Sequence, residues 1–215
     1  NRPWGYSHLH LNTYHMIAEL AEGERDSATG EFLVPYSIGD SMLGEMIPSA
    51  SSMKNYSIGI PYQDIFHRKA VLNNSFFIRN GRLNLVLGWQ QNERLEYADV
   101  LEPDAVELHF LMNTLNYDLR YISPEKDSLQ ISAGINGMDQ VSENRGEEIL
   151  IPEYHLFDVG AYATFRKSNK KADLSGGLRL DHRSVTSVAF GDTTGEEGTL
   201  PFNSISGSIG LAWSM

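Results

Sequence analysis

The chain of 215 residues contains no cysteine, which excludes a disulfide framework and any metal site built on thiolates. Basic residues are also scarce: 17 lysines and arginines stand against 28 aspartates and glutamates, and the net charge is −11. A broad nucleic-acid-binding surface needs clustered lysine and arginine, so nucleic acid is not an expected partner. The length suffices for one domain with a full core, or for part of a larger domain.

Long hydrophobic runs are missing as well. No apolar stretch approaches the roughly 20 residues that a membrane-spanning helix requires, which excludes a helical membrane protein. A transmembrane β-barrel stays open, because its strands are apolar on one face only and average hydropathy hides them. Residues 1–5 have neither the basic nor the apolar region of a signal peptide, so we expect a mature chain or a fragment.

What the chain does contain is a repeated alternation of apolar and polar residues, which is typical of β-strands with two different faces. The pattern is clearest over 172–181, where Leu and Ala fall on one face and Asp, Ser and Arg on the other. Several such segments are longer than the roughly 5–6 residues usual in soluble sheets. The segments lie at about 6–20, 66–79, 82–100, 107–123, 129–138, 157–166, 172–181 and 204–214.

The connections between these segments alternate in length. Asn80-Gly81 predicts a tight hairpin, and further short turns are predicted at 123–127 and 168–170. In an up-and-down meander the short turns then share one end of the sheet and the long loops the other, as in outer-membrane barrels with periplasmic turns and extracellular loops. The loops that we expect to be extracellular span about 21–65, 100–106, 139–153 and 186–202.

The pattern therefore predicts an all-β protein: an antiparallel up-and-down transmembrane β-barrel segment of about eight strands. Aromatic residues near segment ends, such as Trp89 and Trp213, suit the interfacial girdles of such a barrel. A soluble antiparallel sandwich, in which the Leu and Ile faces pack against each other, is the alternative that alternation alone leaves open.

Short runs in a fixed order carry a family resemblance. They are 14–16 (YHM) followed by 23–30 (GERDSATG), 60–63 (IPYQ), 87–92 (LGWQQN), 114–118 (TLNYD), 151–154 (IPEY) with 157–158 (FD), and 175–179 (SGGLR). Together they cover nearly the whole chain, which resembles the middle or C-terminal barrel region of TonB-dependent outer-membrane receptors of the Bacteroidetes type. The resemblance implies that 1–215 is a partial barrel domain, part of a barrel of about 22 strands with a plugged lumen. No plug domain is recognisable in this chain.

The resemblance also implies a function. Such receptors import scarce ligands, foremost iron–siderophore or haem-type complexes, and also cobalamin or glycans. The implied partners are the imported ligand, outer-membrane lipid, and the TonB complex, which acts through a plug that lies outside this chain; no cofactor is expected. A self-contained eight-stranded barrel with a structural or adhesion role and an outer-membrane enzyme are the alternatives. The chain has no nucleophile elbow, zinc-protease or phosphate-loop motif, so we do not expect an enzyme.

Candidate site residues lie on the polar faces of the expected strands. His8, His10 and Tyr14 share one face, where two histidines at i and i+2 suit either contact with an iron chelate or haem, or polar filling of the lumen. We expect the two histidines near the periplasmic end, and no metal site. Charges of both signs face the lumen as well, for ion pairs between strands or with the plug; these are Asp118, Arg120, Asp158, Arg166, Arg179 and Asp181.

An acidic cluster lies in the first long loop. Its members are Glu22, Glu24, Arg25, Asp26 and Glu31. Carboxylates at this density suit either calcium or a solvated loop, and the spacing of an EF-hand is missing.

Overall fold

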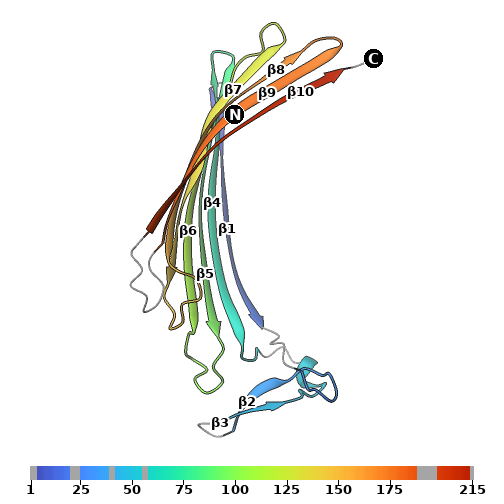
Figure 1. Ribbon diagram of the computed structural model, residues 1–215, viewed down its shortest axis with the longest axis vertical. Coiled ribbons are helices and arrows are strands. Elements are labelled where there is room, and N and C mark those ends of the chain that lie inside the picture. Colours follow the sequence, from blue (N-terminus) through green and yellow to red (C-terminus); the bar gives the residue numbers. More distant parts are fainter. Residues whose placement is uncertain (1–3, 20–24, 39–41, 55–57, 188–197, 214–215) are drawn as a thin grey trace.

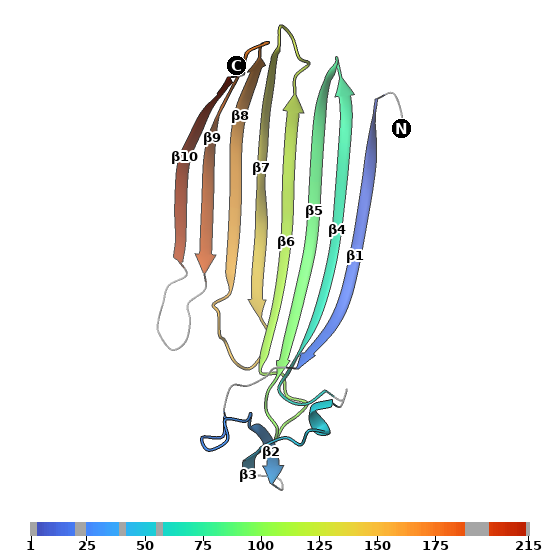
Figure 2. The same cartoon turned by 90° about the vertical axis from the view of Figure 1, so that its right-hand side faces the viewer.

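The computed structural model describes residues 4–19, 25–38, 42–54, 58–187 and 198–213. One antiparallel sheet contains eight strands, in the order β1-β4-β5-β6-β7-β8-β9-β10 (Figures 1 and 2). β1 and β10 form its two edges and are not paired with each other. The eight strands are β1 (Gly5–Glu19), β4 (Tyr62–Ile78), β5 (Gly81–Tyr97), β6 (Leu108–Ile122), β7 (Leu129–Asn144), β8 (Tyr154–Ser168), β9 (Ala172–Ser187) and β10 (Gly198–Trp213).

The all-β, up-and-down architecture predicted from the alternation is thereby confirmed, as an open sheet that matches a section of a larger barrel wall. A barrel closed by these eight strands alone is not what the chain forms. β2 (Val34–Ile38) and β3 (Met42–Met46) make a separate hairpin, followed by the single turn η1 (Ser52–Lys54). Among the described residues no helix has the length and hydrophobicity needed to span a membrane.

The sheet is strongly curved, and its two faces differ in chemistry (Figure 1). Residues directly opposite each other in antiparallel strands share a face, so the strand pairing assigns every side chain to one of the two. One face carries rows such as Asn136–Gly160–Asp181, while the other carries rows such as Leu85–Leu119–Ile135. The polar face is the concave one, because the cavities of the molecule open on it.

No hydrophobic core lies beneath the apolar, convex face. Among the described residues only Ile65 and Leu111 are buried hydrophobic side chains, each with 6% of its surface exposed. On the convex face Ile205 and Ile209 keep 78% and 81% of their surface exposed. A soluble sandwich would cover these side chains with a second sheet, and the described residues form no such layer. The sandwich alternative is therefore wrong.

The expected alternation of short and long connections between successive strands is also present. Short turns at 79–80, 123–128 and 169–171 lie at one end of the sheet. The connections 98–107 and 145–153 lie at the other end, where β1 and β9 also end and β4 and β10 begin (Figure 2). We call these the short-turn end and the long-loop end.

Several strands continue further toward the long-loop end than predicted. Residues 139–144 belong to β7, and the predicted loop 186–202 includes the end of β9 and the start of β10. The alternation fades before these strands end: residues 139–144 and 182–187 are polar except for Val141 and Val185, and the start of β10 has three apolar residues in succession, Leu200, Pro201 and Phe202. The predicted loop 21–65 contains β2, β3, η1 and the start of β4, and strands as short as β2 and β3 leave no sustained periodicity to detect.

The predicted hairpin at Asn80-Gly81 forms one residue earlier in the chain. Arg79 and Asn80 occupy the turn with φ of 46° and 65°, and Gly81 already pairs with Ile78 in the ladder. Gly81 is required for space: a Cβ there would lie 2.6 Å from the Tyr121 hydroxyl oxygen. The glycine thus accommodates a neighbouring strand rather than an unusual backbone angle.

Candidate functional site

The concave face brings together the charges predicted to face the lumen. The pairing places all six on it: Asp118, Arg120, Asp158, Arg166, Arg179 and Asp181. Asp158, Arg179 and Asp181 belong to two neighbouring sets of polar contacts on β7, β8 and β9: one joins Arg179 to Asp181 and Asn136, and the other joins Arg183 to Asp158. We call these five residues the concave network.

Arg179 is the centre of the concave network. Its Nε donates to Asp181 Oδ1 at 2.7 Å, and its Nη2 donates to Asn136 Oδ1 at 2.9 Å, two strands away. The guanidinium spans β8 over Gly160, where a Cβ would lie 2.2 Å from Arg179 Nη2. A side chain on β8 at this point would break the bridge, so the glycine sets the geometry of the network.

Arg183 forms the second ion pair of the concave network. Its Nη2 lies 2.8 Å from Asp158 Oδ2, and its Nε donates to the same oxygen at 2.9 Å. Arg183 is not among the charges predicted from the sequence, although it follows Asp181 by two residues; continuing the alternation beyond 181 would have found it.

A cavity of about 500 Å³ opens on the concave face beside this network. Its lining contains side chains of both positive and negative charge as well as side-chain amides, and it extends from Lys69 on β4 to Arg183 on β9. Asp118 contributes to the lining, whereas Arg120 and Arg166 do not. Arg166 lies near the short-turn end, 3.8 Å from Asp173 in a solvent-exposed pair. Of the six predicted charges, Asp158, Arg179 and Asp181 thus belong to the concave network, and Asp118, Arg120 and Arg166 do not.

His8, His10 and Tyr14 also face the concave side, but on β1, at the opposite side of the sheet from the concave network. The rings of His8 and His10 have centroids 6.4 Å apart, and Tyr14 stacks on His67 at 5.0 Å. Both histidines lie toward the short-turn end, and Tyr14 lies toward the long-loop end. Within the described ranges no three His, Asp or Glu side chains form a group that could hold a metal ion.

The convex face carries a polar row that was not predicted from the sequence. One row of paired residues crosses all eight strands and is polar at every position but Val141. Its members are Thr13, Arg68, Gln91, Asn113, Val141, His155, Thr186 and Thr199. On β1, β4, β5 and β6, the row next to it on the short-turn side is apolar: Leu11, Ala70, Trp89 and Leu115.

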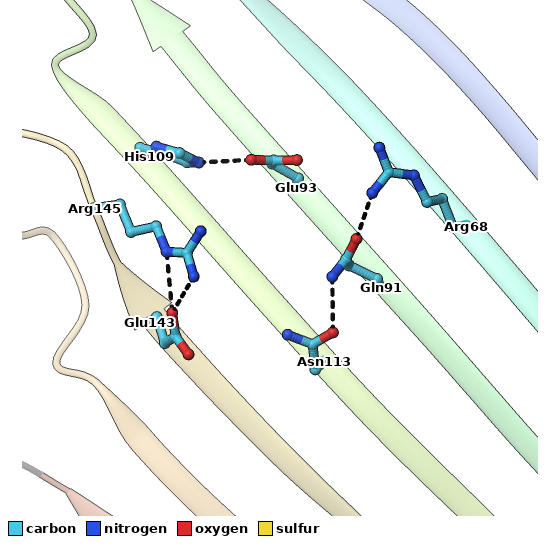
Figure 3. Close-up of polar contacts among 7 residues, drawn as sticks. All are labelled: Arg68, Gln91, Glu93, His109, Asn113, Glu143 and Arg145. Atoms are coloured by element: carbon cyan, nitrogen blue, oxygen red, sulfur yellow. Dashed lines mark hydrogen bonds and ion pairs between the residues drawn. The ribbon is translucent and has the colours of Figure 1, made fainter.

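Hydrogen bonds link this row across strands (Figure 3). Arg68 Nη1 donates to Gln91 Oε1 at 2.7 Å, and Gln91 Nε2 donates to Asn113 Oδ1 at 3.0 Å. At the other side of the sheet the hydroxyl oxygens of Thr186 and Thr199 lie 2.8 Å apart.

Ion pairs lie immediately beyond the row, toward the long-loop end. His109 Nε2 lies 3.0 Å from Glu93 Oε1, and Arg145 donates to Glu143 Oε2 through Nε and Nη2 at 3.0 and 2.7 Å (Figure 3). The same level includes His15 Nε2, 2.5 Å from Asp64 Oδ1. We call the polar row and these six residues the convex polar belt.

Part of the acidic cluster of the first loop lies within the described residues. Glu22 and Glu24 lie outside the described residues. Asp26 Oδ1 accepts hydrogen bonds from the Thr29 hydroxyl at 2.8 Å and from the backbone N–H groups of Thr29 and Ala28 at 2.7 and 3.1 Å. The hydrogen bond from the Thr29 hydroxyl, followed by that from its backbone, lowers the pKa of Asp26 below the ordinary value. Asp26 thus closes a local turn.

Comparison with known proteins gives one informative match. No protein-family model matches the chain, and no curated protein sequence matches it. Among solved structures, the sheet is similar to the ferric yersiniabactin uptake receptor FyuA from Yersinia pestis, with a TM-score of 0.50 and 15% sequence identity. The match covers 71% of this chain and 26% of the receptor, so this chain spans about a quarter of that structure. At this identity the similarity establishes a shared fold.

Proposed function

We propose that the chain forms a section of the barrel wall of a TonB-dependent outer-membrane receptor, and that the complete protein imports a scarce ligand. The observation that carries the proposal is the pairing of an uncovered apolar convex face with a polar, charged concave face on one curved up-and-down sheet. Burying apolar surface stabilises a protein by about 25 cal/mol per Å², so an apolar face with no protein layer over it fits hydrocarbon better than water. The polar face then lines the lumen.

The two open edges support a larger barrel. β1 and β10 present unpaired backbone groups along one side each, which is costly in lipid and favours aggregation in water. Further strands that pair with both edges remove this cost. A section of about a quarter of the length of FyuA agrees with that arrangement. In such a barrel the long-loop end faces the cell exterior and the short-turn end faces the periplasm.

The proposed ligand is an iron–siderophore or haem-type complex. FyuA is a ferric yersiniabactin uptake receptor, and the fold that this chain shares with it makes iron complexes the first ligands to test. The concave network and the residues His8, His10 and Tyr14 are the candidate contacts for ligand or plug on this section of wall. The TonB complex acts through a plug outside this chain, and the barrel itself performs no chemical reaction.

Uptake by a deletion strain tests the proposal. We expect loss of growth on one defined ferric siderophore or on haem as sole iron source, with growth on free ferrous iron retained. Uptake of the radiolabelled iron complex should require both the restored gene and a functional TonB. Unchanged uptake of every iron complex, together with a defect on cobalamin or a glycan, would show that the imported ligand is cobalamin or the glycan and not an iron complex. Recovery of the protein outside the outer-membrane fraction would contradict the whole proposal.

A further inference from the structure

We infer that His8 and His10 form a two-histidine binding site for a divalent transition-metal ion on the concave face of β1. The site is separate from the imported iron complex, and only its position inside a lumen rests on the proposed function. No metal site is expected here from the sequence. Since no group of three candidate ligand side chains occurs among the described residues, the protein supplies two ligands and water completes the coordination.

The two histidines differ from the other five in having free ring nitrogens. Among the described residues, the rings of His8 and His10 contact each other and Tyr6, and neither makes a hydrogen bond or an ion pair. The other five histidines each place a ring nitrogen against a carboxylate or an amide on an adjacent strand. These pairs are His15–Asp64, His67–Asn92, His109–Glu93, His155–Asp139 and His182–Asn203. A histidine binds a metal through a ring nitrogen that is not already engaged, and His8 and His10 have such nitrogens.

The strand holds the two imidazoles on one face, close to the separation that a single metal ion can bridge. Residues at i and i+2 of a strand lie about 6.6 Å apart and point to the same side. The ring centres of His8 and His10 are 6.4 Å apart. A metal–nitrogen bond of about 2.0–2.1 Å places each ring centre roughly 3 Å from a shared metal, so two such centres lie roughly 6 Å apart or less. Both side chains are exposed, and small rotations therefore bring them onto one ion.

The surroundings of the pair select the kind of metal. On β4, Asn73 lies opposite His8 and Val71 lies opposite His10, and Lys69 follows one row further toward the long-loop end. Neither β1 nor β4 has an aspartate or a glutamate on the concave face. Calcium and magnesium prefer several oxygen ligands, carboxylates above all, so these ions do not fit. Imidazole suits copper, nickel and zinc, and among divalent ions copper binds such nitrogen ligands most strongly.

Copper binding by the full-length protein tests the inference, in detergent micelles and without a histidine tag. Copper(II) is titrated into the protein and followed by electron paramagnetic resonance, which reports coordinated imidazole nitrogens. We expect a copper site with nitrogen ligands, and weaker binding of nickel and zinc. His8→Gln and His10→Gln should each lower the copper affinity at least about tenfold. His67→Gln is the matched control, because it removes the third concave histidine and should leave the affinity unchanged.

A relocated pair separates metal binding from a structural role of either histidine. Tyr6 precedes His8 by two residues on the concave face, whereas Ser7 faces the convex side. Adding Tyr6→His to His10→Gln should restore copper binding, and adding Ser7→His should not.

Unchanged affinity in both single variants, an equal loss in His67→Gln, or failure of Tyr6→His to restore binding would overturn the inference. Equal restoration by Ser7→His would do the same, because it would show that the face of the strand is immaterial. None of these measurements depends on iron uptake, so loss of the metal site would leave the proposed function standing.

Discussion

The phenol of Tyr117 lies across Gly137 on the neighbouring strand, and its hydroxyl donates to the backbone oxygen of Asp158 at 2.9 Å, one strand further on. A Cβ on Gly137 would lie 2.6 Å from the Tyr117 hydroxyl oxygen and 1.9 Å from Asp158 O. An aromatic ring over a strand glycine covers backbone that would otherwise be bare, and here it joins β6 to β8 across β7.

Gly137→Ala should therefore destabilise the folded protein by about 1–3 kcal/mol, the usual cost of overpacking. The measurement is the urea midpoint of the full-length protein in detergent micelles. Gly88→Ala is the matched control, because the nearest atom to a Cβ there is 3.8 Å away. Equal stability of the two variants would show that Tyr117 and the backbone at Asp158 move aside without cost.

The bridge made by Arg179 gives a second prediction. Arg179→Met removes the bonds to Asp181 and Asn136 and should cost about 1 kcal/mol, a value kept small by partial solvent exposure. Arg166→Met, which removes the longer, exposed pair with Asp173, should change stability by less than about 0.5 kcal/mol. Thermal unfolding of both variants in the same detergent makes the comparison, and equal effects would contradict a special role for the concave network.

The convex face predicts a strong dependence of charge tolerance on position. Leu87→Arg should destabilise the protein inserted in lipid vesicles by about 2–4 kcal/mol, and Gln91→Arg by only about 0–1 kcal/mol, because the cost of a cation falls toward the membrane interface. Val86→Arg, on the concave face beside Leu87, should be tolerated. Folding yield and urea midpoint in lipid vesicles check all three variants. If Leu87→Arg folds as well as Gln91→Arg, the apolar rows do not face hydrocarbon.

The turn at Asp26 should depend on pH. Because its folded pKa is depressed, the stabilisation that Asp26 gives the turn is full above the ordinary carboxyl pKa and is lost as the pH falls through the depressed value. Thr29→Val removes the hydroxyl donor and should move this loss to higher pH. Hydrogen exchange at the Ala28 and Thr29 amides, expressed relative to intrinsic rates, follows the transition. Asp26→Asn should show no such transition in this pH range. If the transition persists in this variant, the titrating group is not Asp26.

The sequence predicted the strands wherever one face is apolar and the other polar. The segment 172–181 is the clearest example, and the structure continues that strand to Ser187. The continuation was missed because residues 182–187 are polar at every position except Val185, which removes the period-two signal. Arg183 and the end of β7 were lost for this reason.

The convex polar belt was missed for a related reason. Gln91 and Asn113 are distant in sequence, and only the strand register shows that they lie side by side. The bridge from Arg179 to Asn136 likewise depends on Gly160, whose role becomes visible only once three strands are aligned.

The chain-ordered pairing of the eight strands also has a kinetic consequence. From β5 to β10 each strand pairs with the strand that precedes it in the chain, so each added hairpin closes a short loop. Loop-closure entropy grows slowly with length, by about 0.6 kcal/mol per doubling, yet contacts between sequence-distant segments slow folding markedly. Only β1 pairs across a long intervening segment, 20–61, to reach β4. The wall is thus suited to grow hairpin by hairpin from β4 onward, with β1 joining last.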